Sequence, residues 1–205
     1  MSAPKRFLNV GGNHKGIPLA LEYGGWEHVM LDIDPRSNAD LICDARQLAT
    51  LAPSAFDSVY CSQNLEHYHR HEGLQVLKGF RHILKDDGFA FIIVPDMQAV
   101  MKIVVERDLD IDDVLYRTGS GVSILVRDVI YGYGKEIESS GNDFFAHKTG
   151  FTTRSLQRVL EEAGFAQVLV RKKGWLDVMA FAFKQPPSAS LRDYAQSTLD
   201  RLQHG

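Results

Sequence analysis

The stretch Phe7-Leu8-Asn9-Val10-Gly11-Gly12-Asn13-His14-Lys15-Gly16 decides the fold class of this chain. Its apolar first half is typical of a short buried strand, and its three glycines indicate a turn directly after that strand. Glycine allows the backbone of such a turn to approach a bound molecule closely. The stretch therefore predicts a strand whose carboxyl end faces a binding site.

Acidic residues follow the next two predicted strands. Residues 28–31 run into Asp32, and residues 40–43 run into Asp44. An acid about twenty residues after a glycine turn can accept both hydroxyl protons of a ribose. A further acid one strand later is placed to reach the base, so the first fifty residues indicate a nucleoside-bearing cofactor.

Strand and helix patterns alternate through the first hundred residues, which predicts a parallel sheet covered by helices. The predicted strands are 7–10, 28–31, 40–43, 56–61, 89–94, 166–170 and 176–183, and the predicted helices are 17–23, 72–84, 98–107 and 152–163. Residues 89–94 form the most apolar strand, which we expect in the middle of the sheet.

Length and composition predict one globular domain spanning residues 1–205. The net charge of −3 lacks the basic excess that nucleic-acid binding requires. The longest apolar run falls far short of the roughly 20 residues of a membrane span. The first residues contain no apolar signal-peptide core, so we expect a cytoplasmic protein without nucleic-acid or membrane partners.

Two segments depart from the strand and helix alternation. Residues 98–148 form an insertion of glycine-spaced pieces, which we call the insertion. A segment of this kind is usually a cap over a site or an oligomer contact, so a homodimer through the insertion is one of two alternatives. Residues 189–202, after Pro186 and Pro187, predict a polar, peripheral C-terminal helix.

Five segments together resemble a class I S-adenosylmethionine-dependent methyltransferase of the small bacterial type. They are LNVGG at 8–12, LDIDP at 31–35, DARQL at 44–48, FDSVYCSQNLEH at 56–67 and LKGFRHILKDDGFAFIIVPD at 77–96. Their order and spacing carry the resemblance, which covers about residues 5–96. It implies a Rossmann-like, doubly wound α/β sheet of seven strands, mostly parallel with the last strand antiparallel, and helices on both faces.

The resemblance also implies the cofactor, S-adenosylmethionine, and its contacts. Gly11 and Gly12 would form the turn against the methionine part, Asp32 would hold the ribose, and Asp44 with the Ala45 backbone would contact the adenine. The predicted cofactor-binding residues are Gly11, Gly12, Asn13, Asp32, Asp44, Ala45 and Ser62. The turn departs from the GxGxG pattern usual in the family, so the close backbone approach is expected to be built differently.

Methyl transfer is a direct displacement, so the enzyme mainly aligns its substrates and, for hydroxyl or amine acceptors, removes a proton. Histidine is the natural base near neutral pH. His147 and then His67 are the candidate catalytic residues, and the alternative is that each histidine is only held by backbone in a loop. Glu66, Tyr131 and Tyr133 are candidate substrate-binding residues, although the two tyrosines could equally pack the cap.

The histidine-rich segment from Glu66 to Glu72 also raises the question of a metal, since imidazoles and carboxylates are good ligands. His67 and His71 are four residues apart, but the Glu-His pair already belongs to the family pattern. We therefore expect no metal, and we expect His69, His71 and Glu72 to form a solvated helix start.

These observations predict methyl transfer to an oxygen or nitrogen of a small-molecule or carbohydrate-like acceptor. The altered glycine turn leaves open a non-catalytic cofactor-binding or protein-interaction module on the same fold. A nicotinamide-dependent oxidoreductase is a third alternative, against which the missing GxGxxG motif and Asp44 argue.

Overall fold

The computed structural model describes residues 3–12 and 14–204. Within this part of the chain, a seven-stranded sheet has the order β3-β2-β1-β4-β5-β9-β8. Its strands are β1 (Arg6–Val10), β2 (Glu27–Asp32), β3 (Leu41–Ile42), β4 (Phe56–Ser62), β5 (Leu84–Pro95), β8 (Gln167–Lys173) and β9 (Asp177–Phe183). The strands β1 to β5 pair in parallel, whereas β9 runs antiparallel to both β5 and β8. The predicted fold class is confirmed, and β5 lies inside the sheet beside the central β4.

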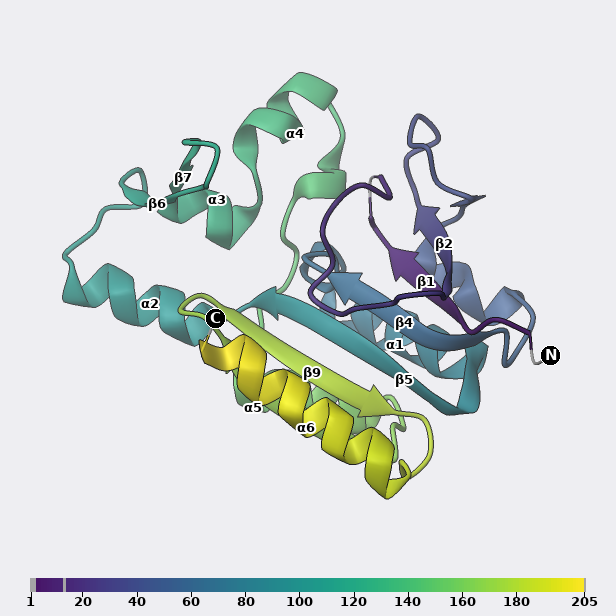
Figure 1. Cartoon of the computed structure of the whole chain (residues 1–205). Helices are drawn as coiled ribbons and strands as arrows, with labels where there is room; N and C mark the ends of the chain where they lie inside the picture. The colour runs from purple at the N-terminus through teal and green to yellow at the C-terminus, as the bar shows by residue number, and fades with distance from the viewer. Residues whose placement is uncertain (1–2, 13, 205) are drawn as a thin grey trace.

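Two hydrophobic cores cover the two faces of the sheet, and Figure 1 shows helices on both sides of the strands. Helices α1 (Arg70–Ile83) and α5 (Thr153–Glu162) cover one face together with the 3-10 helix η1 (Ala45–Thr50). In α1, buried side chains recur every three or four residues, which is the spacing of one helical face. Helix α6 (Ala189–His204) packs on the other face.

The predicted helix over residues 17–23 is wrong, because the structure has bends and irregular backbone there. Pro18 lacks a backbone donor, and the Ala20 N–H donates to the Tyr60 hydroxyl at 3.1 Å instead of to a helical carbonyl. Tyr23 stacks on Phe7 with 3.8 Å between ring centroids. Contacts with the sheet therefore decide the conformation of this segment, and they override its local helix pattern.

Helix α6 forms one layer of the fold, because the side chains of its Ala195 and Leu199 are only 0% and 1% exposed. These side chains pack with Phe181 and Phe183 of β9 in the second core. The helix thus covers a sheet face on which no other helix of the described chain packs.

The insertion lies above the carboxyl ends of the parallel strands (Figure 1). It contains α2 (Met97–Glu106), β6 (Val114–Arg117), β7 (Ser123–Leu125), α3 (Val126–Tyr131), α4 (Gly134–Ser140) and the 3-10 helix η3 (Asp143–Phe145). Val100, Leu115, Val126 and Val129 form a small core of its own. At its end, the N–H groups of Lys148 and Thr149 donate to the Glu66 carbonyl, which joins the insertion to the sheet edge.

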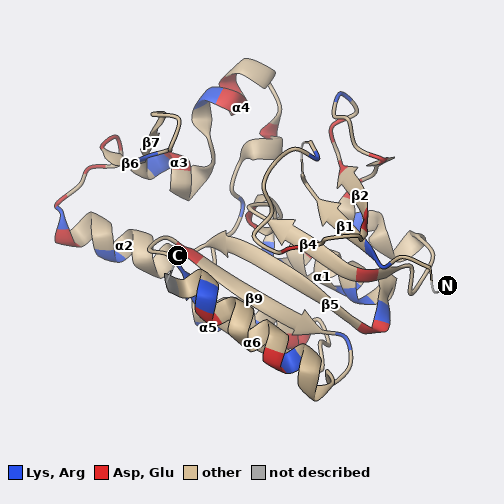
Figure 2. Ribbon diagram, viewed as in Figure 1, with Lys and Arg blue, Asp and Glu red and all other residues tan. Residues whose placement is uncertain are grey.

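Charged residues of both signs are interspersed, as α4 and α6 illustrate (Figure 2). In the described part of the chain, no helix combines the length and the apolar character needed to cross a membrane.

Candidate functional site

A cavity of about 440 Å³ opens at the carboxyl ends of β1, β2 and β4, and we call it the glycine-turn cavity. Its wall includes Val10, Gly11, Leu31, Asp32, Ile33, Asp34, Arg36, Ser37, Cys43, Gln63, Asn64, His67, Tyr68, Glu136, Phe144 and Phe145. Ligands of open α/β sheets bind at this edge. The volume lies within the usual range for cofactor and small-molecule sites.

The glycine turn has a geometry that only glycine supports. Gly11 has φ +73°, and its N–H donates to the Leu31 carbonyl at 2.8 Å. A Cβ atom on Gly11 would overlap the amide of Asn64, and one on Gly12 would overlap the amide of Asn9. Close packing thus brings the backbone of this turn against the cavity, although the turn lacks the GxGxG sequence pattern.

Asp32 ends β2 with one carboxylate oxygen available to a ligand. Its Oδ1 accepts the Asp34 N–H at 2.9 Å. Among the described residues, no hydrogen bond engages its Oδ2. Two further polar atoms of wall residues, the Ser37 hydroxyl and Asn64 Oδ1, are buried without a partner in that part of the chain. Such a set of unused acceptors suits a ligand rich in hydroxyl groups.

Four of the predicted cofactor residues, Gly12, Asp44, Ala45 and Ser62, are not among the wall residues of this cavity. The Asp44 carboxylate caps η1 and accepts the Arg46 N–H at 2.9 Å. Ala45 is buried in the first core. Ser62 lines a separate surface cavity beside Ile93, and Asn13 lies outside the described residues.

A second cavity of about 380 Å³ separates the sheet edge from the insertion, and we call it the insertion cavity. Gln63, Glu66, His67, Pro95, Tyr116, Ile124, Asp128, Val129, Tyr133, Phe145, His147, Leu176 and Asp177 line it. The two cavities share three wall residues, Gln63, His67 and Phe145. Of the two predicted tyrosines, Tyr133 lines this cavity, whereas Tyr131 is 63% exposed and lines neither.

Glu66 is a buried carboxyl group without a hydrogen-bond partner. It belongs to the 3-10 helix η2 (Leu65–His67), is 2% exposed, and neither of its side-chain oxygens is paired among the described residues. Burial raises its pKa to about 8, because the charged form loses solvation.

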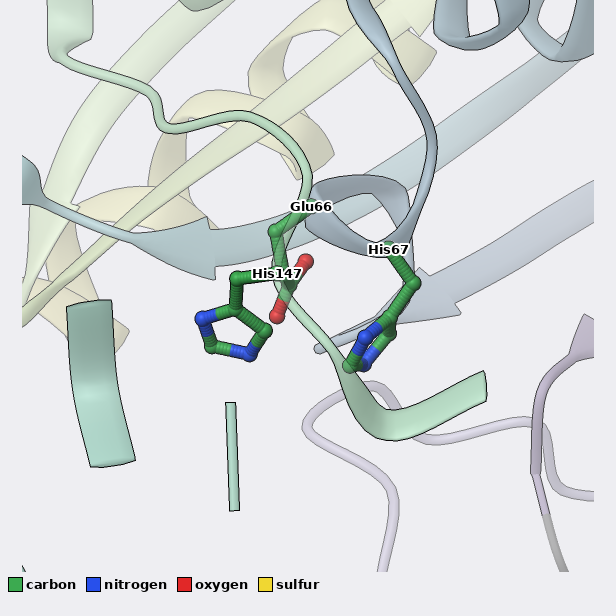
Figure 3. Close-up of side chains that lie close together, drawn as sticks. All are labelled: Glu66, His67 and His147. Atoms are coloured by element: carbon green, nitrogen blue, oxygen red, sulfur yellow. The ribbon is translucent and has the colours of Figure 1, made fainter. Parts of the chain in front are cut away.

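His67 and His147 approach each other beside Glu66 (Figure 3). Their ring centroids are 4.9 Å apart. The Nδ1 of His67 lies 3.1 Å from the Ala146 carbonyl, and the Nδ1 of His147 lies 2.9 Å from the Val129 carbonyl. A carbonyl can only accept, so each Nδ1 carries a proton and each neutral ring presents a lone pair at Nε2. Backbone therefore holds both rings at Nδ1, and within the described residues no hydrogen bond engages either Nε2.

Burial keeps both imidazoles neutral. It lowers the pKa of His67 to about 4, and it lowers the pKa of His147 below the usual value as well. The carbonyl partners of Nδ1 oppose this effect without cancelling it. Both candidate catalytic imidazoles are thus uncharged at neutral pH, with a proton at Nδ1 and a lone pair at Nε2.

Gln63 and Asp177 also line the site, although the sequence patterns did not predict them. Gln63 adopts φ +51°, a left-handed conformation that concentrates at functional sites, and its side-chain amide donates to Asp177 at 3.0 Å. A sequence signal was present for Gln63, because it directly follows β4 at the sheet edge where ligands of such folds bind. Asp177 opens the antiparallel β9, so its arrival at this edge depends on the reversed strand and has no local signal.

No protein-family model matches the sequence, and no curated protein matches it. Solved structures do resemble the fold. A protein from Pyrococcus horikoshii OT3 is 18% identical with a TM-score of 0.58, over 89% of this chain and 83% of that one. An S-adenosylmethionine-dependent methyltransferase from Archaeoglobus fulgidus is 14% identical with a TM-score of 0.56, over 87% of this chain and 86% of that one.

A third structure, from Burkholderia thailandensis, is 1,6-didemethyltoxoflavin-N1-methyltransferase with 1,6-didemethyltoxoflavin and S-adenosylhomocysteine bound. It is 16% identical with a TM-score of 0.51, over 89% of this chain and 72% of that one. The strand order, the reversed β9 and these likenesses agree. The chain has the fold of class I S-adenosylmethionine-dependent methyltransferases.

Proposed function

We propose that the protein transfers the methyl group of S-adenosylmethionine to an oxygen or nitrogen of a small polar acceptor. The observation that carries this proposal is the pair of adjoining cavities, which share Gln63, His67 and Phe145 in their walls. One cavity suits the cofactor and the other suits the acceptor. Direct displacement requires the acceptor atom to reach the methyl carbon, and adjoining cavities place the two substrates next to each other.

The residues around the glycine-turn cavity fit S-adenosylmethionine. Gly11 and Gly12 would pass close to its methionine part, and the free oxygen of Asp32 would accept from its ribose. Asp44 and the Ala45 backbone stay our proposed adenine partners. Arg46 donates to both oxygens of the Asp44 carboxylate, so the adenine amino group would replace one of these contacts. When bound, the cofactor supplies a methyl group on a sulfonium.

The insertion cavity offers two proton acceptors for the acceptor molecule. Uptake of a proton at Nε2 of His147 leaves Nδ1 donating to the Val129 carbonyl, which stabilises the resulting cation. His147 is the better base, since the pKa of His67 is lowered to about 4. Tyr133 and Asp177 add polar groups to the wall, which favours a hydroxylated, carbohydrate-like acceptor.

The similar structures agree with a small acceptor. The Burkholderia thailandensis enzyme holds 1,6-didemethyltoxoflavin, and a second neighbour, from Haemonchus contortus, holds phosphomonomethylethanolamine. Both ligands are small molecules.

Calorimetric titration with S-adenosylmethionine and with NAD tests the cofactor class. We expect binding of S-adenosylmethionine alone, and absence of its binding at millimolar concentration would refute the proposal. Release of S-adenosylhomocysteine on addition of a panel of hydroxylated and amine acceptors tests transfer. Cofactor binding without any release would favour the non-catalytic module.

We further propose self-association through the insertion. Its outer surface exposes apolar side chains, among them Met101 at 56% and Val105 at 80% on α2. Such exposed apolar residues are typical of interaction surfaces when they occur together.

A further inference from the structure

We propose that Glu66, His67 and His147 bind a divalent transition-metal ion in the wall of the insertion cavity. Their ligand atoms all lie within 4.8 Å of one another. Figure 3 shows the three side chains converging from η2 and from the end of the insertion. The segment from Glu66 to Glu72 predicted no metal because its Glu-His pair belongs to the family pattern, and His147 joins that pair only in the tertiary structure.

The two histidines are prepared for coordination by their backbone contacts. Histidine ligands of metals usually donate the other ring N–H to a carbonyl or carboxylate, which fixes both tautomer and ring orientation. The Nδ1 contacts of His67 and His147 with the Ala146 and Val129 carbonyls do the same. Both Nε2 lone pairs remain for an ion.

Glu66 provides an anionic ligand when its carboxyl group loses its proton to solvent as the ion binds. Its carboxyl group is buried, both oxygens lack a partner, and within residues 3–12 and 14–204 no lysine or arginine pairs with it. A buried polar group without a partner is unfavourable, and a bound cation would satisfy it. Asp177 adds a second acidic group to the same cavity wall.

The distances require only a small adjustment. Ligands bonded at about 2.1 Å lie no more than about 4.2 Å from one another. Small rotations of the side chains close the remaining gap, and His147 lies on the last residues of the insertion, where the chain is half-buried.

The ligand set indicates which ion binds. Two imidazoles and one carboxylate favour zinc, iron, cobalt, nickel or manganese over magnesium, which prefers oxygen ligands. Three protein ligands also leave coordination positions open toward the cavity. If the proposed function holds, a hydroxyl of the acceptor would occupy one of them. The ion would lower the pKa of that hydroxyl, and the proton would go to solvent, because Nε2 of His147 would then be a metal ligand and not the base.

Titration of the untagged, chelator-treated protein with Co²⁺, followed by its visible absorption, tests the site. We expect one equivalent of bound Co²⁺, displacement by Zn²⁺ and no displacement by equimolar Mg²⁺. His147→Gln and Glu66→Gln should each weaken Co²⁺ binding at least about tenfold. His71→Gln is the matched control, because it removes an exposed imidazole from the same segment and should leave binding unchanged.

Two results would overturn the metal site: no uptake of Co²⁺ or Zn²⁺ by the wild type, or wild-type affinity in both variants. Thermal unfolding of each variant shows whether it is folded. If Glu66→Gln does not fold, the Co²⁺ affinity of His147→Gln alone decides the outcome. Titration of S-adenosylmethionine into the same metal-free protein separates the two proposals. Cofactor binding without metal uptake refutes the metal site alone, and metal uptake without cofactor binding refutes the proposed function alone.

Discussion

Replacing Asp32 by asparagine should weaken S-adenosylmethionine binding without disturbing the fold. In the structure, Oδ1 accepts the Asp34 N–H, and an asparagine oxygen can keep that bond. The other oxygen has no partner among the described residues, and in the variant it becomes an NH2 group that cannot accept. The substitution therefore removes one charge-assisted hydrogen bond to the ribose.

Hydrogen bonds to charged groups contribute about 1.5–3 kcal/mol. The dissociation constant should therefore rise about 10- to 150-fold, as measured by calorimetry on the metal-free protein. Glu27→Gln is the control, because it neutralises an acid on the same strand that pairs with Arg6 away from the cavity. An affinity of Asp32→Asn within about threefold of the wild type, less than 1 kcal/mol, would refute the assignment.

Three further predictions concern the turn, the second core and the insertion. Gly11→Ala should lower the free energy of unfolding by about 1–3 kcal/mol in urea, because φ is +73° and the new Cβ overlaps a neighbouring amide. Gly24→Ala, where the Cβ meets open space, is its control, and equal stability of the two variants would contradict the argument. Leu199→Ala should cost about 2–5 kcal/mol in the same assay, since its side chain is 1% exposed, and a cost below about 1 kcal/mol would mean that α6 does not pack as described. In analytical ultracentrifugation the wild type should dimerise and Val105→Glu should be monomeric; a monomeric wild type would exclude self-association.

Much of the sheet was predictable because its strands carry local patterns. Residues 89–94 are apolar throughout, as a strand covered on both faces must be, and they lie inside β5. The irregular backbone of residues 17–23 was not predictable, since the Tyr60 hydroxyl that accepts the Ala20 N–H comes from a distant strand. Burial of Leu199 likewise depends on which sheet face remained open for α6.

The sequence by itself determined the fold class, the position of the glycine turn and the acid that ends β2, because each depends on residues adjacent in the chain. Only the tertiary structure decided how the other groups meet. It holds Asp177 against Gln63, 114 residues earlier, through the antiparallel pairing of β9. It also brings His147 to Glu66 and His67, because the insertion leaves the sheet after β5 and hydrogen-bonds back to the Glu66 carbonyl. Such contacts depend on chain topology, which local periodicity and residue spacing do not encode.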